Sequence, residues 1–409
     1  MDSESETAAT EAAPVPARRV MEMIELALHA SFTRFPAIAA LALPLFVLVF
    51  VPSALSNWLG YRAAAEVFSN FVGSFSMQNF DPNALRFYLE GNAAVPEVPG
   101  SALMDLLGLV SWIGGLAFGP LVLGALVLLI VGQSLDIRIE AMQAWRGAAR
   151  RASSLIFTEL VKAILLGLIA LISVLVAMVV LILGGSIIDL VVGSLDARIA
   201  GAFAVFFFVF VGGVIALGPV AYAYLLWIYT IPVVLMEGAG ISRAFERSAR
   251  MVRYRPAGQR IWETHPMRLT GLLTVAGLTL LVASLPAFGP VLLWLGKSFG
   301  QIANDPTIIF SMPTSVFVFS VLLMALPQVV LAALFQGSIG LYYLDARVRD
   351  EDQTHGGELV RDYLSELASG GMPEPALPRA APAPADAPPS QAPAWHPGRS
   401  LPSNWPDGR

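Results

Sequence analysis

Six long apolar stretches dominate the pattern of hydrophobic and polar positions along the chain. A helix that spans a membrane needs about 20 consecutive, mostly apolar residues. The stretches that meet this length cover residues 36–55, 106–129, 155–183, 203–235, 269–295 and 316–341. The sequence therefore predicts an all-α polytopic membrane protein with six transmembrane helices.

The fourth stretch is ambiguous because it is too long for one straight span. No charged residue occurs between Ile199 and Met236, and a single helix of that length would be about 57 Å long at 1.5 Å per residue. The hydrocarbon core of a bilayer is only about 30 Å thick. The segment is either one tilted or broken helix, with its break at Gly212-Gly213 or Gly218-Pro219, or two short passes.

The distribution of arginine predicts the orientation of the spans. The segment 136–154 carries 4 arginines and the segment 238–268 carries 7, whereas 301–314 has none. Segments rich in Lys and Arg stay on the cytoplasmic side of the membrane. Both ends of the chain are then cytoplasmic, the number of spans is even, and one pass fits between residues 199 and 236.

An amphipathic segment precedes the first, third and fifth spans. On a helical wheel, the segments 20–35, 137–151 and 241–254 each place apolar residues on one face and polar residues on the other. All three contain a small and then a large residue, followed by a small or aromatic one: Ala27-Leu28 with Ser31, Ala141-Met142 with Trp145, and Ala244-Phe245 with Ser248.

The recurrence of this pattern predicts a threefold internal repeat. Each unit consists of one amphipathic helix in the plane of the membrane and a hairpin of two spans. Helices of this kind lie at the interface and place their arginines among the lipid headgroups. The third unit differs from the others by an extra segment, residues 255–268.

The cytoplasmic arginines are the candidate docking residues for lipid headgroups or for a protein partner. On the second and third amphipathic helices they are Arg146, Arg150, Arg243, Arg247 and Arg250. Asp345, Arg347 and Arg349 leave the last span together and form a second candidate cluster. The alternative interpretation of this second cluster is an anchor that obeys the charge rule and contains one local salt bridge.

Composition agrees with a membrane protein and limits the possible chemistry. The chain of 409 residues is 56% hydrophobic and 13% charged, with a net charge of −5 and no cysteine. Soluble proteins carry about twice this charged fraction, and the mild negative charge argues against a nucleic acid partner. The four histidines do not have the spacing of metal ligands.

No catalytic constellation is visible in the sequence. A nucleophile elbow, a phosphate-binding loop and a dinucleotide fingerprint are all missing. We therefore expect no catalytic, cofactor-binding or metal-binding residue, and no cofactor. Glu159 and Lys162 are expected to pair at the cytoplasmic end of the third span. An intramembrane enzyme would need Glu159, Glu237 and Asp345 to meet in one interfacial pocket.

The remaining segments flank the predicted membrane domain, residues 18–349. Residues 1–17 and the Pro/Ala-rich tail 372–409 have the composition of disordered segments. We expect a short cytoplasmic helical extension over 350–371. The largest external element is the loop 57–101, in which an aromatic stripe predicts a helix that packs on the membrane or on the protein.

Two short motifs resemble a large prokaryotic group of uncharacterised six-span membrane proteins. Residues 235–238 (LMEG) and 244–252 (AFERSARMV) are similar to the group's element E-G, A-L-x-R-S-x-x-L-V. Residues 341–351 (LYYLDARVRDE) are similar to its ending L-Y-Y-D-x-R-x-R-x-E. The chain departs from this pattern by an inserted Leu344 and by the extra segment 255–268.

The group includes the membrane domain that is fused to some glycerophosphoryl diester phosphodiesterases. The resemblance extends over residues 20–365 and implies a six-span fold in the cell envelope. It implies no catalytic residue, because the sequence contains no run of the kind that the phosphodiesterase domain supplies.

These observations lead to one expected function and one alternative. We expect a non-enzymatic protein of the cytoplasmic membrane that organises or assists envelope or lipid-linked machinery. Its partners would be anionic lipid headgroups at the cytoplasmic face and a possible protein partner in the membrane. The alternative is a transporter or permease subunit for a lipophilic or small substrate, since transporters are often built from repeats.

Overall fold

The computed structural model describes residues 19–74, 101–192, 197–254, 264–302, 312–350, 355–373 and 375. Every regular element in these ranges is a helix. Six of the described helical segments are long and apolar enough to cross a membrane: Phe35–Arg62, Ala102–Ser134, Ala152–Val180, Phe210–Glu237, His265–Gln301 and Thr314–Arg349. The prediction of an all-α membrane protein with six apolar helices is confirmed.

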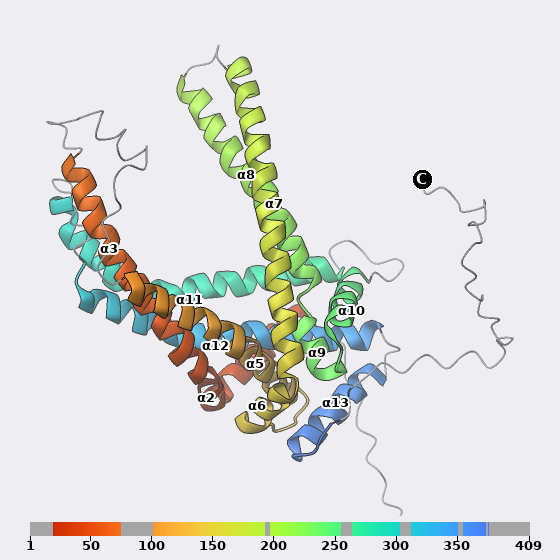
Figure 1. Cartoon of the computed structure of the whole chain (residues 1–409). Helices are drawn as coiled ribbons and strands as arrows, with labels where there is room; N and C mark the ends of the chain where they lie inside the picture. Colours follow the sequence, from red (N-terminus) through yellow and green to blue (C-terminus); the bar gives the residue numbers. More distant parts are fainter. Residues whose placement is uncertain are drawn as a thin grey trace, which may run out of the picture.

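The spans form three consecutive helical hairpins (Figure 1). The first consists of α2 (Phe35–Leu45), η1 (Phe46–Phe50) and α3 (Val51–Ser74) with α5 (Ser101–Ser134). The second consists of α7 (Ala152–Val192) with α8 (Ala197–Leu226) and α9 (Thr230–Glu237). The third consists of α11 (His265–Ile302) with α12 (Thr314–Asp350).

Four shorter helices gather at the end of the bundle opposite the hairpin tips. They are α1 (Val20–Thr33), α6 (Ala141–Arg150), α10 (Ile241–Arg253) and α13 (His355–Ala368). Side chains from all four belong to one buried cluster with the adjacent ends of the spans. We call these four helices the collar and this end of the molecule the collar end. The hairpins extend away from the collar end in two directions, since the tip of α7 and α8 points to the top of the view and those of the other two hairpins to the left (Figure 1). We call the tip of each hairpin its far end.

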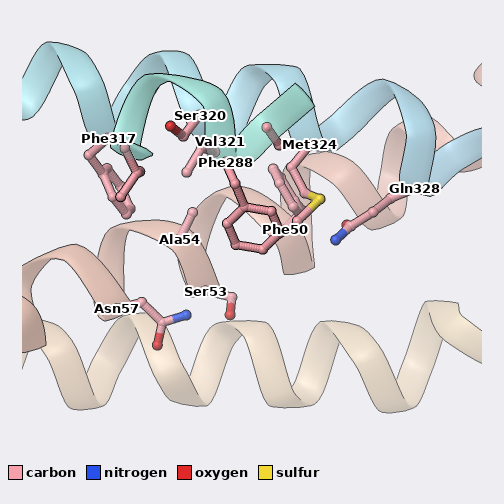
Figure 2. Close-up of a pocket in the computed structure, with 12 residues that line it drawn as sticks. Phe50, Ser53, Ala54, Asn57, Phe288, Phe317, Ser320, Val321, Met324 and Gln328 are labelled. Carbon is pink, nitrogen blue, oxygen red and sulfur yellow. The ribbon is translucent and has the colours of Figure 1, made fainter. Parts of the chain in front are cut away.

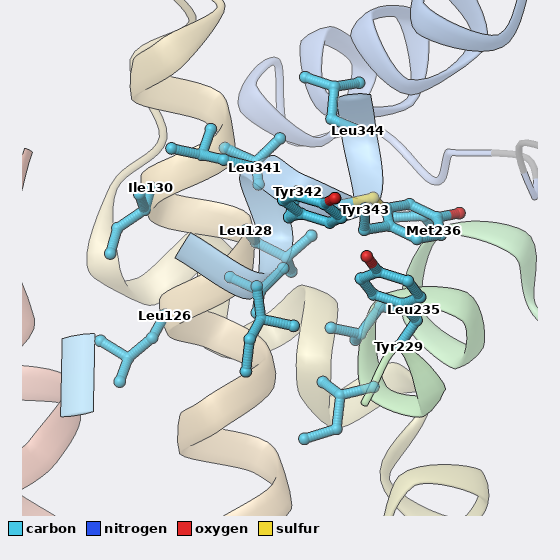
Figure 3. Close-up of a cluster of buried hydrophobic side chains, with 14 of the residues drawn as sticks. Leu126, Leu128, Ile130, Tyr229, Leu235, Met236, Leu341, Tyr342, Tyr343 and Leu344 are labelled. Atoms are coloured by element: carbon cyan, nitrogen blue, oxygen red, sulfur yellow. The ribbon is translucent and has the colours of Figure 1, made fainter. Parts of the chain in front are cut away.

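The core lies at the collar end, between the second half of α5, the short α9 and the last third of α12 (Figure 3). All residues of α12 from Gly337 to Val348 are buried. The two glycines of this segment bring α12 close to α5, because a Cβ atom at Gly337 would lie 2.5 Å from Ile130 Cδ1 and one at Gly340 would lie 2.8 Å from Val131 Cγ2. Small residues permit this close approach of membrane helices.

The fourth span is a single pass with a break close to the collar end. Helix α8 runs without interruption through the predicted break sites at Gly212-Gly213 and Gly218-Pro219, so this part of the prediction was wrong. The break falls between Leu226 and Thr230. Ser248 of α10 binds backbone groups at both ends of this break. Its Oγ donates a hydrogen bond to the Leu226 carbonyl (2.7 Å) and accepts one from Tyr229 N–H (3.1 Å).

The first span contains a π-helical turn, η1, two residues after Pro44. Such a turn is wider than an α-helical turn and displaces backbone carbonyls from their usual partners. Here Ser111 Oγ of α5 donates a hydrogen bond to the Val49 carbonyl (3.0 Å). The first span therefore changes its helix type locally after Pro44, and a neighbouring helix stabilises this change.

The collar helices differ in register from the sequence pattern. In α6 the buried residues are Ala144, Gly147 and Ala148, whereas Met142 is 58% exposed and Trp145 is half-buried. Of the predicted apolar face of this helix, Ala148 is buried, whereas Ile137, Ala141 and Trp145 are half-buried. The expected polar faces of α1 and α10 are exposed with one exception, Arg247.

Several predicted segments lie wholly or partly outside the described residues. They are the N-terminal segment 1–17, most of the tail 372–409, residues 255–263 of the extra segment in the third unit, and residues 75–100 of the external loop. The first part of that loop is the continuation of α3 to Ser74, and the helix α13 lies within the predicted extension 350–371.

Candidate functional site

Two of the predicted docking arginines are exposed on the collar. Arg146 of α6 and Arg243 of α10 lie on the outer faces of their helices. Neither has a hydrogen-bond or ion-pair partner among the described residues. Their guanidinium groups are therefore available to an anionic ligand at the collar end.

Two more are exposed but already have partners. Arg150 Nη1 donates a hydrogen bond to the Gly371 carbonyl (2.9 Å), which ties α6 to the chain beyond α13. Arg250 pairs with Glu246 one turn earlier on α10 (2.7 Å), and both side chains are about two-thirds exposed (66% and 67%). A surface pair of this kind is readily exchanged for another anion.

Arg247 turns toward the protein interior. Its Nε lies 3.4 Å from Glu237 Oε1 at the end of α9, and the Glu237 side chain is only 1% exposed. The same carboxylate oxygen accepts a hydrogen bond from Tyr343 Oη of α12 (2.8 Å). Arg347, one turn further along α12, is 0% exposed and lies 3.5 Å from Tyr343 Oη through Nη1.

A second buried carboxylate, that of Asp345, lies on α12. Asp345 Oδ2 accepts hydrogen bonds from Arg349 Nε (2.9 Å) and Arg268 Nη1 of α11 (3.3 Å). We call the whole group the buried ion cluster: Glu237, Arg247, Arg268, Tyr343, Asp345, Arg347 and Arg349. It connects α9, α10, α11 and α12 at the level where they meet the collar.

Aromatic rings surround the buried ion cluster. Tyr229 stacks on Tyr342 (centroids 6.2 Å apart), and His265 contacts the same Tyr342 ring edge to face (5.8 Å). The guanidinium carbon of Arg268 lies 5.2 Å from the Tyr342 centroid. Figure 3 places Tyr229 and Tyr342 between α9 and α12. These contacts replace part of the solvation that the charges lose on burial.

The burial of the cluster corrects the interpretation of the last span. Asp345 and Arg347 were predicted as docking residues together with Arg349, yet they are 3% and 0% exposed. A side chain without accessible surface cannot receive a lipid headgroup or a protein partner. These residues hold helices together, as does Arg247, and the exposed docking candidates reduce to Arg146, Arg150, Arg243 and Arg250.

A separate polar cluster lies beside the break in the fourth span. The predicted pair of Glu159 and Lys162 is present on α7, with 2.6 Å between Oε1 and Nζ. Thr230, the first residue of α9, donates a hydrogen bond from its hydroxyl to the same Glu159 oxygen (3.1 Å). The hydroxyl of Thr158 is buried and has no hydrogen-bond partner among the described residues. Lys162 also lies 5.9 Å from the Tyr224 ring centroid.

The three carboxylates required for an intramembrane enzyme have separate partners. Glu159 binds Lys162 and Thr230, whereas Glu237 and Asp345 belong to different ion pairs of the buried ion cluster. Within the described ranges, no group of three or more His, Cys, Asp or Glu side chains could hold a metal ion. The carboxylates therefore do not form one reactive pocket.

Helix α13 completes the collar end by packing on α6. Gln143 Nε2 donates a hydrogen bond to the Ala368 carbonyl (2.7 Å). Burial raises the pKa of the Tyr363 hydroxyl, although Arg151 and Arg150 act in the opposite direction. The tyrosine is thus neutral at physiological pH and serves as a packing residue.

Sequence reasoning missed the interior role of Glu237 and the tyrosines. Glu237 and Tyr343 are 106 residues apart in the chain, so local periodicity carries no information about their contact. One signal was available, because both residues occur in the two motifs that resemble the six-span group.

Gly238, in the same motif, has a local reason for being glycine. It ends α9 with a φ of 62°, and a Cβ atom there would lie 2.8 Å from Arg151 Nη2. Only glycine adopts this left-handed conformation without strain.

Comparison of the chain with protein-family models, with curated proteins and with solved structures finds no match. The function is therefore inferred from the residues and their geometry.

Proposed function

We propose that the protein is a non-enzymatic organiser of the cytoplasmic membrane that binds anionic lipid headgroups through its collar and presents this surface to envelope or lipid-linked machinery. The observation that carries the proposal is that Arg146 and Arg243 are exposed and have no hydrogen-bond or ion-pair partner in the part of the chain that the structure describes. An exposed arginine near an anionic membrane surface contributes about 1 kcal/mol of attraction.

The buried ion cluster supports this proposal because it fixes the collar on the spans. Arg247 of α10 binds Glu237 of α9, while Ser248 bonds to the backbone of the fourth span. Helix α10, which carries Arg243, is thus attached to the core by two adjacent residues at its middle, Arg247 and Ser248. A fixed arrangement of arginines binds headgroups with a smaller loss of conformational entropy than mobile side chains do.

The threefold repeat belongs to the same proposal. The residues before α1 and α6, Arg19 and Glu140, share backbone angles of φ −82° and ψ 155°. The residues after these helices, Arg34 and Arg151, agree within one degree at φ −106° and −107° with ψ 17°. These angles support a common origin for the first two units, whereas the residues that flank α10, Gly240 (φ −69°, ψ 168°) and Tyr254 (φ −59°, ψ 126°), differ from them.

Counting from these helix ends also supports an alignment of the first two units. Ala27 precedes Arg34, and Ala144 precedes Arg151, by the same number of residues, and both alanines are buried. In α10 the same count back from Tyr254 gives Arg247, so the third unit does not keep this register, although Ala244 and Ser248 are buried there. Small residues at these positions allow each collar helix to pack closely on the spans.

The collar end faces the cytoplasm in this proposal. It carries the arginine-rich segments that the charge rule assigns to the inside, and the far end holds the hairpin tips. The proposed membership of the uncharacterised six-span group is consistent with this arrangement, since both of its motifs contribute to the buried ion cluster. The proposed location is the cytoplasmic membrane, with both chain ends inside.

The test measures lipid retention by the full-length protein. We would purify it from mixed phosphatidylglycerol and phosphatidylcholine nanodiscs and count the bound lipids by native mass spectrometry. Replacing Arg146 or Arg243 with Glu should lower phosphatidylglycerol retention at one site about fivefold or more, as expected for the loss of about 1 kcal/mol.

The matched control is Lys297→Glu, which makes the same change of charge at an exposed position near the far end of α11. This variant should retain as much phosphatidylglycerol as the parent protein. Equal retention by the collar variants and the parent would refute the proposal, and so would an equal loss in the control.

A second candidate function is transport of a lipophilic or small substrate, and the broken fourth span favours it. Transporters often place substrate or ion sites at interrupted membrane helices, and here the break lies beside Glu159, Lys162 and Thr230. Lys162→Met, which removes the charge but keeps the length, should abolish uptake into proteoliposomes if this site drives transport. Unchanged uptake, or no uptake by the parent protein, would leave the organiser as the proposed function.

A further inference from the structure

Three adjoining cavities lie among the spans outside the collar. Their volumes are about 440, 280 and 460 Å³. One polar residue is common to the walls of all three cavities, namely Gln328 of α12, which follows Pro327. Together they have the size of a large ligand pocket, about 1,000 Å³.

The first cavity lies between α3, α11 and α12 (Figure 2). Phenylalanine rings from η1, α11 and α12 form much of its wall: Phe50, Phe288 and Phe317. Three short polar side chains also line it, Ser53 and Asn57 from α3 and Ser320 from α12. Figure 2 shows Gln328 projecting from α12 at one end of this cavity and Phe317 at the other.

The other two cavities continue the first past Gln328. The second shares Phe50 and Ser53 with the first and runs along the π-helical turn η1 toward α5. The third shares Ala332 with the second and lies between α11 and α12. A turn that departs from α-helical geometry is frequent at functional sites, and here it shapes the wall of two cavities.

The polar side chains of the cavities lack a full set of protein partners. Gln328 and Asn57 are exposed. The Ser320 hydroxyl is buried and has no hydrogen-bond partner among the described residues. A polar group left without a partner in an apolar medium costs about 1–3 kcal/mol. These groups therefore require a ligand that offers hydrogen-bonding atoms.

Their depth makes bulk water an unsuitable partner. Gln328 is 14 residues beyond Thr314, the first residue of α12, which corresponds to a rise of about 21 Å. Arg62 donates a hydrogen bond to Thr314 Oγ1 (3.1 Å) and lies 5.0 Å from the Trp58 centroid. An arginine and an aromatic ring of this kind mark the membrane surface. The polar row thus leads from the surface at Asn57 inward to Gln328.

The chemistry of the lining selects the class of ligand. Among the described residues, no charged side chain lines any of the three cavities, and the walls are otherwise apolar. The groups available are amides and hydroxyls, which are neutral donors. They match the ester carbonyl and hydroxyl oxygens of a lipid, whose acyl chains match the apolar walls.

We propose that these cavities bind one ester-linked glycerolipid. Its ester or hydroxyl oxygens accept hydrogen bonds from the amides of Asn57 and Gln328, and its acyl chains occupy the space along η1 and between α11 and α12. This site lies in the spans, away from the collar arginines. It requires no contribution from Arg146 or Arg243, so the two proposals can fail separately.

The test uses the full-length protein in phosphatidylcholine nanodiscs with a photoactivatable probe. The probes are a diacylglycerol and a phosphatidylcholine, each carrying a diazirine in the middle of one acyl chain. Labelled peptides should concentrate in residues 46–57 and 320–335, and Gln328→Leu should lower labelling at least about fivefold, the minimum expected for one buried hydrogen bond.

Two further variants separate loss of the site from loss of the fold. Thr274→Val removes an exposed hydroxyl from α11 that bonds only within its own helix, to the Thr270 carbonyl (2.8 Å), and it should label like the parent. Val321→Trp fills the first cavity without removing a polar group, and it should reduce labelling as strongly as Gln328→Leu. Both are checked for a parent-like melting temperature.

The possible outcomes decide between occupants. Labelling spread evenly over the exposed faces of the spans, with no effect of Gln328→Leu, would overturn the proposal. Cross-links between two protein copies through α12 in place of lipid labelling would also overturn it. Preference for the phosphatidylcholine probe over the diacylglycerol would support the site and place a phosphate near Arg62 at its mouth.

Discussion

The two ends of the same spans have opposite characters. At the collar end, the last third of α12 is buried from Gly337 to Val348 and contains two charged residues, Asp345, which is ion-paired with Arg268 and Arg349, and Arg347, which lies within 3.5 Å of the Tyr343 hydroxyl. At the far end, the first half of the same helix exposes large apolar residues such as Val318 (47%) and Leu322 (56%). One helix therefore serves as the core of a compact assembly at one end and as a lipid-facing span at the other.

The difference shows which forces stabilise each region. The collar end has the close packing of a soluble protein interior, so its stability depends on internal contacts. In the far half, apolar side chains face the bilayer, and lipid tails are as apolar as the side chains themselves. Apolar contact alone therefore adds little to the association of the spans there.

The largest expected effect comes from removing a charge from the collar end. Glu237→Gln should destabilise the protein by about 3–5 kcal/mol, because it removes the buried carboxylate that pairs with Arg247 and accepts the hydrogen bond of Tyr343. The free energy of unfolding would be measured by titration with sodium dodecyl sulfate from mixed micelles.

The control is Glu246→Gln, which breaks the exposed pair with Arg250 on the same surface of the protein. It should cost less than about 1 kcal/mol. If the two substitutions cost the same, the cluster around Glu237 would not differ in kind from a surface ion pair, and the contrast between the two ends would lose its electrostatic basis.

Two leucines, one at each end of the spans, test how much side-chain packing contributes to stability in each region. Leu128 of α5 is 0% exposed at the collar end, whereas Leu281 of α11 is 59% exposed in the far half. Leu128→Ala should cost about 2–5 kcal/mol because it leaves a cavity in a packed core. Leu281→Ala should cost much less, since lipid can fill the space.

Titration with sodium dodecyl sulfate would give the free energy of unfolding of both leucine variants. A large loss for Leu281→Ala would mean that a partner protein or a second copy covers this face of α11. Equal and small losses would mean that the collar end is loosely packed in the membrane.

The smallest effect concerns the attachment of the collar to the broken span. Ser248→Ala removes the hydroxyl that bonds to both Leu226 and Tyr229 and should cost about 1–3 kcal/mol by leaving backbone groups without partners. Amide hydrogen exchange at residues 226–230 should increase at the same time.

Ser31→Ala is its matched control. Ser31 is also a buried collar serine, but its hydroxyl bonds only to the Ala27 carbonyl of its own helix (2.7 Å). It should leave hydrogen exchange in the fourth span unchanged. Faster exchange at residues 226–230 in both variants would indicate general loosening and would contradict a specific role for Ser248.

The roles of the arginines illustrate how far sequence reasoning reached. Arg146 and Arg347 both lie in segments that the charge rule assigns to the cytoplasmic side. The structure leaves Arg146 exposed and buries Arg347 completely. The charge rule depends only on the presence of a positive residue near a span. It therefore cannot distinguish an exposed arginine that could bind a lipid headgroup from a buried arginine that contacts other helices.

The polar residues of the spans illustrate a signal that was present but isolated. Gln328 interrupts the apolar stretch 316–341, and Ser53 does the same in 36–55. Each alone is unremarkable in a membrane helix. Only the packing of α3 against α12 brings them to one series of cavities, where their shared need for hydrogen-bond partners becomes apparent.

The sequence by itself determined the class of architecture, because hydrophobic length is a local property: about 20 apolar residues specify a span wherever they occur. It also indicated where the collar helices lie, because their periodicity is local. The tertiary structure alone decided the break at Leu226–Thr230, the partners of Glu237 and the inward turn of Arg347. These features depend on contacts between residues far apart in the chain, and no short window of sequence encodes such contacts.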